Sequence, residues 1–183
     1  VRERITLPEG ISTPAIDWGS YAGKRRHLPW FLLAARLLAN NGLPVFMHGD
    51  TGESADRLYT QNALAALDMP VAQSFSEAQE HLAASHFAYL PLTAFAPGIK
   101  RLMQLRDLLG LRSPVHSVAR MLNPLSATLS VHGIFHRGYE HIHQRAACLL
   151  NEPSVLVFKG EGGEAEINPE MATELFISRA QAV

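Results

Sequence analysis

The sequence predicts an α/β domain in which helices cover both faces of a mostly parallel central sheet. Short apolar runs, each of a length that suits a buried strand, alternate with longer segments of helical periodicity. Parallel strands joined by right-handed crossovers place the loops that follow them along one edge of the sheet. The runs cover residues 43–47, 87–92, 129–135 and 155–158, and the loops expected at that edge are 48–54, 92–98 and 159–166.

The expected helices carry start or stop signals. Pro29 suits the first turn of a helix, where its missing N–H costs nothing, and Gly42 is a good terminator for that helix. Ser54 is placed to cap the next helix, through about residue 67, and Ser76 with Gln79 has capping-box spacing before a short helix. We also expect a short strand and an irregular loop over 1–27, a helix over 98–109 that Gly110 stops, and helices over 113–123 and 138–150.

Length and composition predict one α/β domain over residues 1–183, with 47% apolar and 18% charged residues. The formal net charge of -1 excludes a chain-wide basic footprint, so any nucleic-acid site must be local. A single cysteine, Cys148, excludes an intrachain disulfide and fits a reducing, cytoplasmic location. No apolar run approaches the ~18 residues that span a bilayer, so we expect no membrane association. The first residue is Val1, and we therefore expect an excerpt of a longer protein, with a processed product as the alternative.

Four groups of residues resemble one known family. His48-Gly49, Ala66-Leu67, Leu109-Gly110-Leu111-Arg112 and Asn123-Pro124-Leu125 stand where the α/β domain of anthranilate phosphoribosyltransferase has similar motifs. That enzyme is one of the glycosyl transferases, together with the pyrimidine nucleoside phosphorylases, and the resemblance covers about residues 30–168. It implies the phosphoribosyltransferase-like α/β fold. It also implies a missing N-terminal helical dimerisation domain, a missing C-terminal part and a homodimer for the full-length protein.

The motifs of that family that bind phosphoribosyl pyrophosphate are altered here. Where the family has Lys-His-Gly-Asn-Arg, this sequence has Met47-His48-Gly49-Asp50-Thr51, which loses two cations and gains a carboxylate. The Gly-rich pyrophosphate loop corresponds to residues 17–27, which keep scattered glycines without the pattern. The family's magnesium-binding Asp-Glu pair resembles Ala165-Glu166, with Glu164 and Glu161 as near substitutes. Glu166 and Glu164 are therefore the candidate metal ligands, and an exposed acidic turn is the alternative.

This combination resembles a branch of the family that keeps the fold, loses the substrate motifs and has been assigned to nucleic-acid binding. The resemblance implies a protein without a cofactor that binds nucleic acid, expected to be single-stranded, without sequence specificity. The alternative is an enzyme that transfers phosphoribose from phosphoribosyl pyrophosphate to anthranilate or a related aromatic amine, with magnesium. Both functions remain open at this point.

The densest basic cluster is Lys24-Arg25-Arg26-His27, flanked by Trp18, Tyr21 and Trp30. Cations that track phosphates, interleaved with aromatic rings that stack bases, are typical of a surface that binds single strands. The alternative is a solvated loop whose tryptophans pack under the following helix.

Other residues border the same expected edge of the sheet. His48 and Gly49 follow a strand. His48 is expected to contact an anion or to shape its loop, and a role as acid or base in proton transfer is the alternative. Lys100, Arg101 and Arg112 are dispersed cations that we expect at the border of the same cleft. The four histidines at 132, 136, 141 and 143 have no cysteine or paired carboxylate near them, and the pattern does not favour a zinc site, which needs about four converging ligands.

Overall fold

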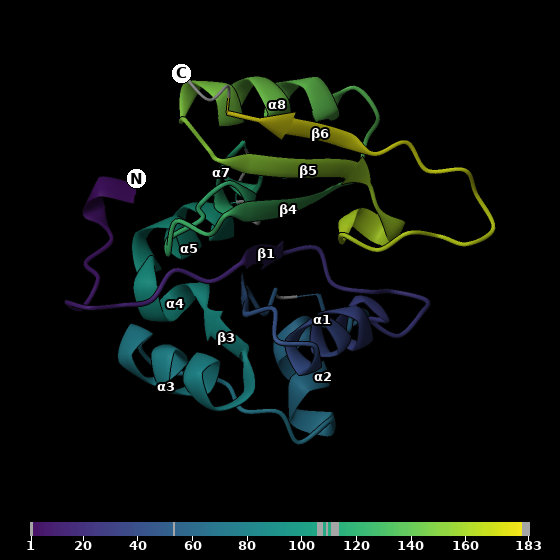
Figure 1. The fold of residues 1–183 in the computed structure, drawn as a ribbon. Helices are drawn as coiled ribbons and strands as arrows, with labels where there is room; N and C mark the ends of the chain where they lie inside the picture. The colour runs from purple at the N-terminus through teal and green to yellow at the C-terminus, as the bar shows by residue number, and fades with distance from the viewer. Residues whose placement is uncertain (1, 53, 106–107, 109, 111–113, 181–183) are drawn as a thin grey trace.

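A computed structural model describes residues 2–52, 54–105, 108, 110 and 114–180. Six strands form one sheet in the order β3-β2-β1-β4-β5-β6 (Figure 1). The first five strands run parallel, and β6 is antiparallel to β5. Their bounds are β1 Ile16–Ser20, β2 Val45–Gly49, β3 Phe87–Pro91, β4 Leu129–Ile134, β5 Ser154–Lys159 and β6 Phe176–Arg179. The predicted fold class, a mostly parallel α/β sheet, is confirmed.

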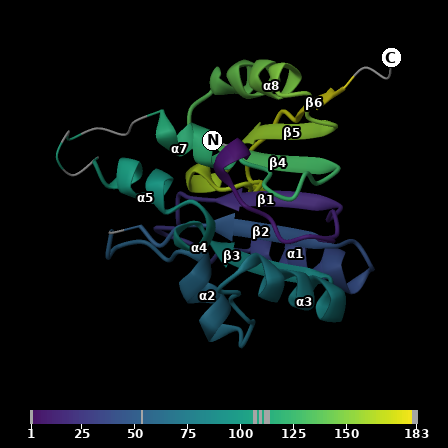
Figure 2. The same cartoon turned by 90° about the vertical axis from the view of Figure 1, so that its left-hand side faces the viewer.

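Helices lie on both faces of this sheet, as Figures 1 and 2 show together. Helix α1 packs on β2 and β3 from one side, whereas α3 packs on the same strands from the other. Helix α8 covers β4, β5 and β6. The helices are α1 Phe31–Asn40, α2 Thr60–Ala66, α3 Phe75–Ser85, α4 Leu92–Phe95, α5 Pro97–Gln104, α7 Val115–Arg120 and α8 Tyr139–Leu149, with 3-10 turns η1 Arg2–Arg4 and η2 Glu161–Gly163. No described helix combines the length and the apolar content that crossing a bilayer takes.

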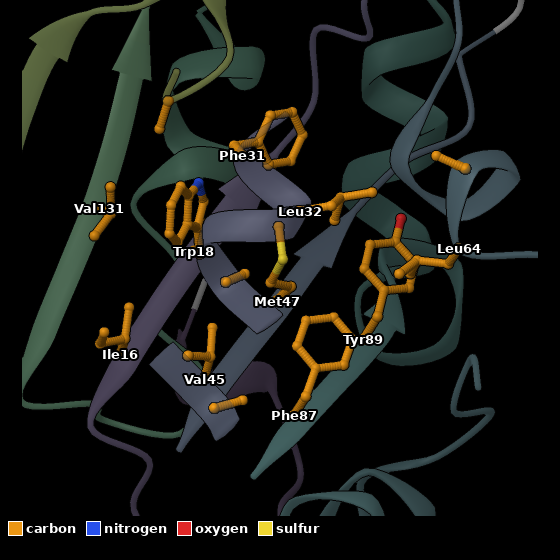
Figure 3. Close-up of a cluster of buried hydrophobic side chains, with 14 of the residues drawn as sticks. Ile16, Trp18, Phe31, Leu32, Val45, Met47, Leu64, Phe87, Tyr89 and Val131 are labelled. Carbon is orange, nitrogen blue, oxygen red and sulfur yellow. The ribbon is translucent and has the colours of Figure 1, made fainter. Parts of the chain in front are cut away.

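Alternation along the strands divides the core into two faces. Side chains on one face of β1, β2 and β3 meet α1, and Figure 3 shows this cluster, with Trp18, Met47 and Tyr89 among its members. The Trp18 and Phe31 rings stack with their centroids 6.1 Å apart. On the opposite face Phe46 packs against Phe75 of α3. Successive side chains of a strand point to opposite faces of the sheet. A shift of one residue in the strand register would therefore move a polar side chain into this core.

Several predicted boundaries are wrong. Helix α2 begins at Thr60 and not at Ser54, because the segment before it pairs with the loop after β1 through a bridge between Lys24 and Leu58. Ser74, and not Ser76, caps α3 by accepting a hydrogen bond from the backbone N–H of Glu77. Strand β6 was not predicted, because its four residues are half-buried or exposed and give no apolar run. The helix predicted over 98–109 spans Pro97–Gln104, and Arg112 lies outside the described residues.

Two buried histidines face each other between β4 and α8. The Nδ1 atoms of His132 and His143 are 3.1 Å apart, and both residues are nearly inaccessible. Burial lowers the pKa of His143 to about 4, with the charge of Arg120 lowering it further and Glu140 opposing that shift. Burial and the neighbouring His143 hold the pKa of His132 well below its usual value. Both rings are therefore neutral in the folded protein at neutral pH.

This pair predicts a loss of stability in mild acid. As the pH falls from about 6.5 toward 4, unfolded histidines bind protons that the folded ones do not, so the folded state loses up to about 3 kcal/mol from His143. Above pH 6.5 both states leave the ring neutral, and this loss is absent. Urea unfolding at several pH values gives the free energy of unfolding as a function of pH. In His143→Gln this free energy should fall less steeply between pH 6.5 and pH 4 than in the wild type. The exposed His141→Gln on the same helix should keep the wild-type slope, and equal slopes in all three proteins would contradict the prediction.

Candidate functional site

The carboxyl ends of β1 and β4 form the point where the strand order reverses, since the chain continues from β1 to β2 on one side and β4 lies on the other. Open α/β sheets bind ligands at this edge. Three segments meet there: the loop of residues 21–27 after β1, the start of the loop after β2, and residues 160–166 after β5. The last of these, which we call the acidic loop, is the yellow-green segment after β5 in Figure 1.

The acidic loop returns closely onto the ends of the neighbouring strands. A Cβ at Gly160 would lie 1.6 Å from the Glu164 carbonyl oxygen, and one at Gly133 would lie 2.3 Å from the Ala165 nitrogen. Only glycine leaves room for backbone at these distances. The returning turn places the side chains of Glu164 and Glu166 against the loop that follows β1.

Glu164 is buried beneath that loop. Its Oε1 accepts hydrogen bonds from the backbone N–H groups of Ala22 and Gly23, each at 2.6 Å. Two neighbouring N–H groups that converge on one oxygen form a concave site for an anion. Burial lowers the pKa of the nearby Arg120 guanidinium, and the Glu164 carboxylate opposes that shift. A side chain of the protein itself thus occupies this anion site.

Glu166 makes the second link to the loop after β1. Its Oε1 lies 2.6 Å from Nζ of Lys24, and its Oε2 accepts a 3.0 Å hydrogen bond from the N–H of Phe31, in the first turn of α1. The positive end of the helix dipole favours a carboxylate at this place. Lys24 is only 3% exposed. The predicted role of Lys24 as a surface cation is therefore wrong, because Glu166 pairs with it inside.

His48 belongs to a buried chain of polar groups and does not line a cleft. Tyr21 Oη lies 2.5 Å from His48 Nδ1, and His48 Nε2 lies 3.3 Å from Asp17 Oδ2. Burial raises the pKa of Tyr21 well above its usual value, so the hydroxyl donates to Nδ1 and Nε2–H donates to Asp17. The predicted anion contact of His48 is wrong, because the ring is fully buried and both nitrogens are bonded inside the fold; its hydrogen bonds fit a role in shaping the loop. Gly49 is needed for close packing, since a Cβ there would lie 2.1 Å from the Ser20 carbonyl oxygen.

The other predicted cations have separate places. Lys100 pairs with Asp50 Oδ2 at 2.7 Å and also donates to the carbonyl of Thr51. It therefore neutralises the carboxylate that replaces the family's asparagine. Arg101 is exposed on α5, away from the residues that line the cleft described next.

Arg25 and Arg26 do face an open cleft, of about 640 Å³, at the carboxyl ends of β4 and β5. We call it the cationic cleft, because basic side chains from four segments line it: Arg25, Arg26, Arg57, His136, Arg137 and Lys159. Phe135, 46% exposed, contributes an aromatic ring to the same wall. Three carboxylates, Glu140, Glu161 and Glu174, are also part of the lining.

The ion pairs that the cleft arginines form are exposed, so these cations remain able to bind an external anion. Arg25 pairs with Asp56 at 2.6 Å and Arg137 with Glu174 at 3.8 Å, but all four side chains are at least half exposed. Exposed pairs of this kind contribute little and exchange readily for other anions. Arg57 donates to the carbonyls of Ala22 and Gly23, which ties it to the loop after β1.

The stacking residues need correction. Trp18 and Tyr21 are buried, Trp18 against Phe31, so neither ring is available to a base. For Trp18, packing under the following helix is the reading that the structure supports. Trp30 is 55% exposed at the start of α1 but does not line the cationic cleft. Phe135 was missed, together with Arg137 and Lys159. Their signal in the sequence is that each lies at or just after the end of a predicted strand.

The acidic loop does not fit magnesium. Both Glu166 oxygens and one Glu164 oxygen already bind a cation or N–H groups of this chain. Within the described ranges no group of three or more His, Cys, Asp or Glu side chains is arranged to hold a metal ion. The predicted metal role of Glu164 and Glu166 is thus replaced by hydrogen bonds to the loop after β1.

Comparison with known proteins places the chain near one enzyme family. No family model matches it. It is 25% identical over 176 residues to the uncharacterised protein YbiB of Escherichia coli, a match that covers 94% of this chain and 53% of YbiB. It is 26% identical over 133 residues to the anthranilate phosphoribosyltransferase of Sulfolobus acidocaldarius, covering 73% of this chain and 39% of the enzyme. The chain thus spans about half the length of these relatives or less.

Solved structures agree on the fold. Anthranilate phosphoribosyltransferase from Thermus thermophilus superposes with a TM-score of 0.72 at 23% identity, over 91% of this chain and 50% of the enzyme. The Saccharomyces cerevisiae enzyme, in complex with phosphoribosyl pyrophosphate and magnesium, has a TM-score of 0.76 at 17% identity, over 98% and 52%. This chain therefore has an anthranilate phosphoribosyltransferase-like α/β domain, related to those enzymes at low sequence identity.

The hydrogen bonds among Asp17, Tyr21 and His48 predict that removal of the Tyr21 hydroxyl lowers the free energy of unfolding. Tyr21→Phe leaves Nδ1 of His48 without its donor in a site closed to water, which should destabilise the fold by about 1–3 kcal/mol. Urea unfolding at pH 7.5 measures the change. The exposed Tyr139→Phe removes the same atom from the surface and should stay within about 0.5 kcal/mol of the wild type. Equal stability of the two variants would contradict the geometry described for His48.

Proposed function

We propose that this anthranilate phosphoribosyltransferase-like chain binds single-stranded nucleic acid in the cationic cleft and has lost the transferase substrate site. The observation that carries the proposal is that basic side chains from four separate segments line one open cleft. Nucleic-acid affinity depends mainly on cations that neutralise phosphates. Arg26 and Lys159 form no ion pair with any described residue and stand ready for that role.

Phe135 favours a single strand over a duplex. An exposed aromatic ring beside cations offers a face to an unpaired base, and such stacking is sequence-tolerant because every base has a π-face. The bases of a duplex are stacked on one another and are not available to a ring in this position. Binding without sequence specificity and with strong salt dependence follows from these parts.

Three contacts support the loss of the substrate site. The N–H groups of Ala22 and Gly23, in the loop that resembles the family's pyrophosphate loop, already bind Glu164. Met47, at the position of a family lysine, is buried in the core. Asp50, at the position of the asparagine, is paired with Lys100. A pyrophosphate needs N–H and cationic partners, and here those groups bind carboxylates of the chain instead.

For the longer protein we propose a cytoplasmic homodimer. Cys148 is an exposed free thiol, which suits a reducing compartment. Leu33 and Leu37 are exposed one turn apart on α1, next to Trp30, and supply an apolar face that a second subunit could cover. Sedimentation of the full-length protein tests the dimer.

The cationic cleft predicts a charge-specific loss of affinity. Arg25→Ala/Arg26→Ala should weaken binding of a labelled single-stranded oligonucleotide and lower the slope of log K against log salt by about 1.4, since each lost phosphate contact on a single strand is worth about 0.7. Fluorescence anisotropy at several salt concentrations measures both. Arg36→Ala/Arg145→Ala removes two exposed cations outside the cleft and should leave the slope unchanged. Equal effects of the two double variants would overturn the site.

The transferase alternative has a support of its own, because a structure with this fold binds phosphoribosyl pyrophosphate and magnesium. An added arm of the same assay separates the two functions. With magnesium present, phosphoribosyl pyrophosphate should neither displace the oligonucleotide nor give heat in a calorimetric titration. Saturable, magnesium-dependent binding would restore the transferase function.

If Phe135 stacks on a base, its removal should lower oligonucleotide affinity by the same factor at every salt concentration. Phe135→Ala should reduce oligonucleotide affinity by about 1–3 kcal/mol, the usual contribution of one stacked base, with the salt slope unchanged. Phe135→Trp keeps a stacking face and should retain the affinity. Tyr139→Ala, an exposed ring outside the cleft, is the matched control. A Phe135→Ala variant that binds as tightly as the wild type would remove the stacking role.

A further inference from the structure

We propose that Glu164 and Glu166 act as internal anions that position the nucleic-acid site, holding the loop of residues 21–27 in the shape that turns Arg25 and Arg26 into the cationic cleft. This inference rests on the proposed function and adds a positioning role for two carboxylates that would, by charge alone, oppose nucleic acid.

Glu164 fixes the start of the loop. Its Oε1 accepts from two consecutive N–H groups, those of Ala22 and Gly23, and the side chain is only 1% exposed. Gly23 has a φ of 67°, a left-handed conformation that turns the backbone directly after this contact. The loop therefore has its anion at all times and requires no external phosphate to fold.

Glu166 fixes the direction of the side chains that follow. It holds Nζ of Lys24 inside the protein, while the backbone of Lys24 pairs with Leu58 through hydrogen bonds of 2.9 and 2.7 Å. Lys24 stands in this isolated bridge, and the chain bends directly after it over residues 25–27. Lys24 points inward, whereas Arg25 and Arg26 after the bridge are exposed, Arg25 with 59% of its side chain.

The acidic loop also contributes to the lining of the cleft, together with Lys159 before it. Lys159 ends β5, and the acidic loop begins at the next residue, Gly160. The chain from Lys159 to Glu164 therefore joins this cation to the carboxylates that bond the 21–27 loop. Cations of the cleft that are far apart in the sequence are linked through the acidic loop.

A carboxylate that only repels phosphates and a carboxylate that positions the loop predict opposite changes in oligonucleotide affinity when the carboxylate is removed. Removing a carboxylate near a polyanion site raises affinity if the carboxylate only repels phosphates. If it holds the arginine loop in place, its removal lowers affinity. The double variant Lys24→Met/Glu166→Gln removes one cation and one anion together, so the net charge is unchanged and no buried charge is left without its partner. Glu164→Gln is the second variant, and Glu161→Gln, a carboxylate that lines the cleft without bonding the loop, is the control.

The test measures oligonucleotide affinity by anisotropy and amide exchange by NMR, at a temperature where circular dichroism shows each variant folded. We expect Lys24→Met/Glu166→Gln and Glu164→Gln to bind about three- to tenfold more weakly, with a salt slope lowered by about 1. Glu161→Gln should bind more tightly than the wild type. Exchange at Phe31 should quicken in the first variant, and at Ala22 and Gly23 in the second.

A cycle with Arg25→Ala/Arg26→Ala shows whether the carboxylates act through the arginines. In that background the two positioning variants should cause no further loss. Affinity that is unchanged or raised in both positioning variants overturns the inference and leaves the proposed function standing. A further loss in the arginine-free background also overturns it, because the carboxylates would then act elsewhere. Absence of oligonucleotide binding by the wild-type chain overturns the proposed function and the inference together.

Discussion

Glu164 and Glu166 bind the loop after β1 through hydrogen bonds and an ion pair, and the edge of this sheet depends on these contacts. Glu164 lies 142 positions from Ala22 and 141 positions from Gly23 in the sequence. Lys24 and Glu166 are also 142 positions apart. β1 is a central strand, and its loop leads directly into α1, whose first residue Phe31 also bonds to Glu166 and packs on Trp18. Because a buried carboxylate without partners is very costly, these hydrogen bonds are also the condition under which the acidic loop can fold back.

The buried chain of Asp17, His48 and Tyr21 gives the same edge a second polar support. His48 belongs to the residues through which the sequence resembles that family, and here it is fully buried and bonded on both ring nitrogens. The hydrogen bonds of His48 thus serve the fold itself. The contacts that hold the sheet edge are internal to the protein, so this edge is formed without a bound ligand.

Sequence reasoning predicted the parallel sheet and the edge where loops converge, because apolar runs such as 43–47 and 87–92 reflect burial on both faces of a strand. It named Arg25 and Arg26, which line the cleft, but gave Lys24 the same role. The direction of Lys24 is set by the bridge to Leu58 and the pair with Glu166, and neither contact leaves a local pattern. Phe135 was missed for a related reason. At the end of an apolar run it resembles one more core residue, and only the strand's end in space exposes it.

The net charge of -1 left room only for a local basic site, and selective burial explains how such a site can form. Among the described residues the buried acids are Asp17, Asp50, Glu140, Glu152 and Glu164, whereas the buried bases are Lys24 and Arg120. Apart from Glu140, which also lines the cleft, these carboxylates lie away from the surface that a ligand meets, while most of the cations stay outside the buried core. The described surface is consequently more basic than the composition indicates. A near-neutral chain can then present a cationic cleft without an excess of lysine and arginine, because the carboxylates that balance these cations in the composition are used inside the fold.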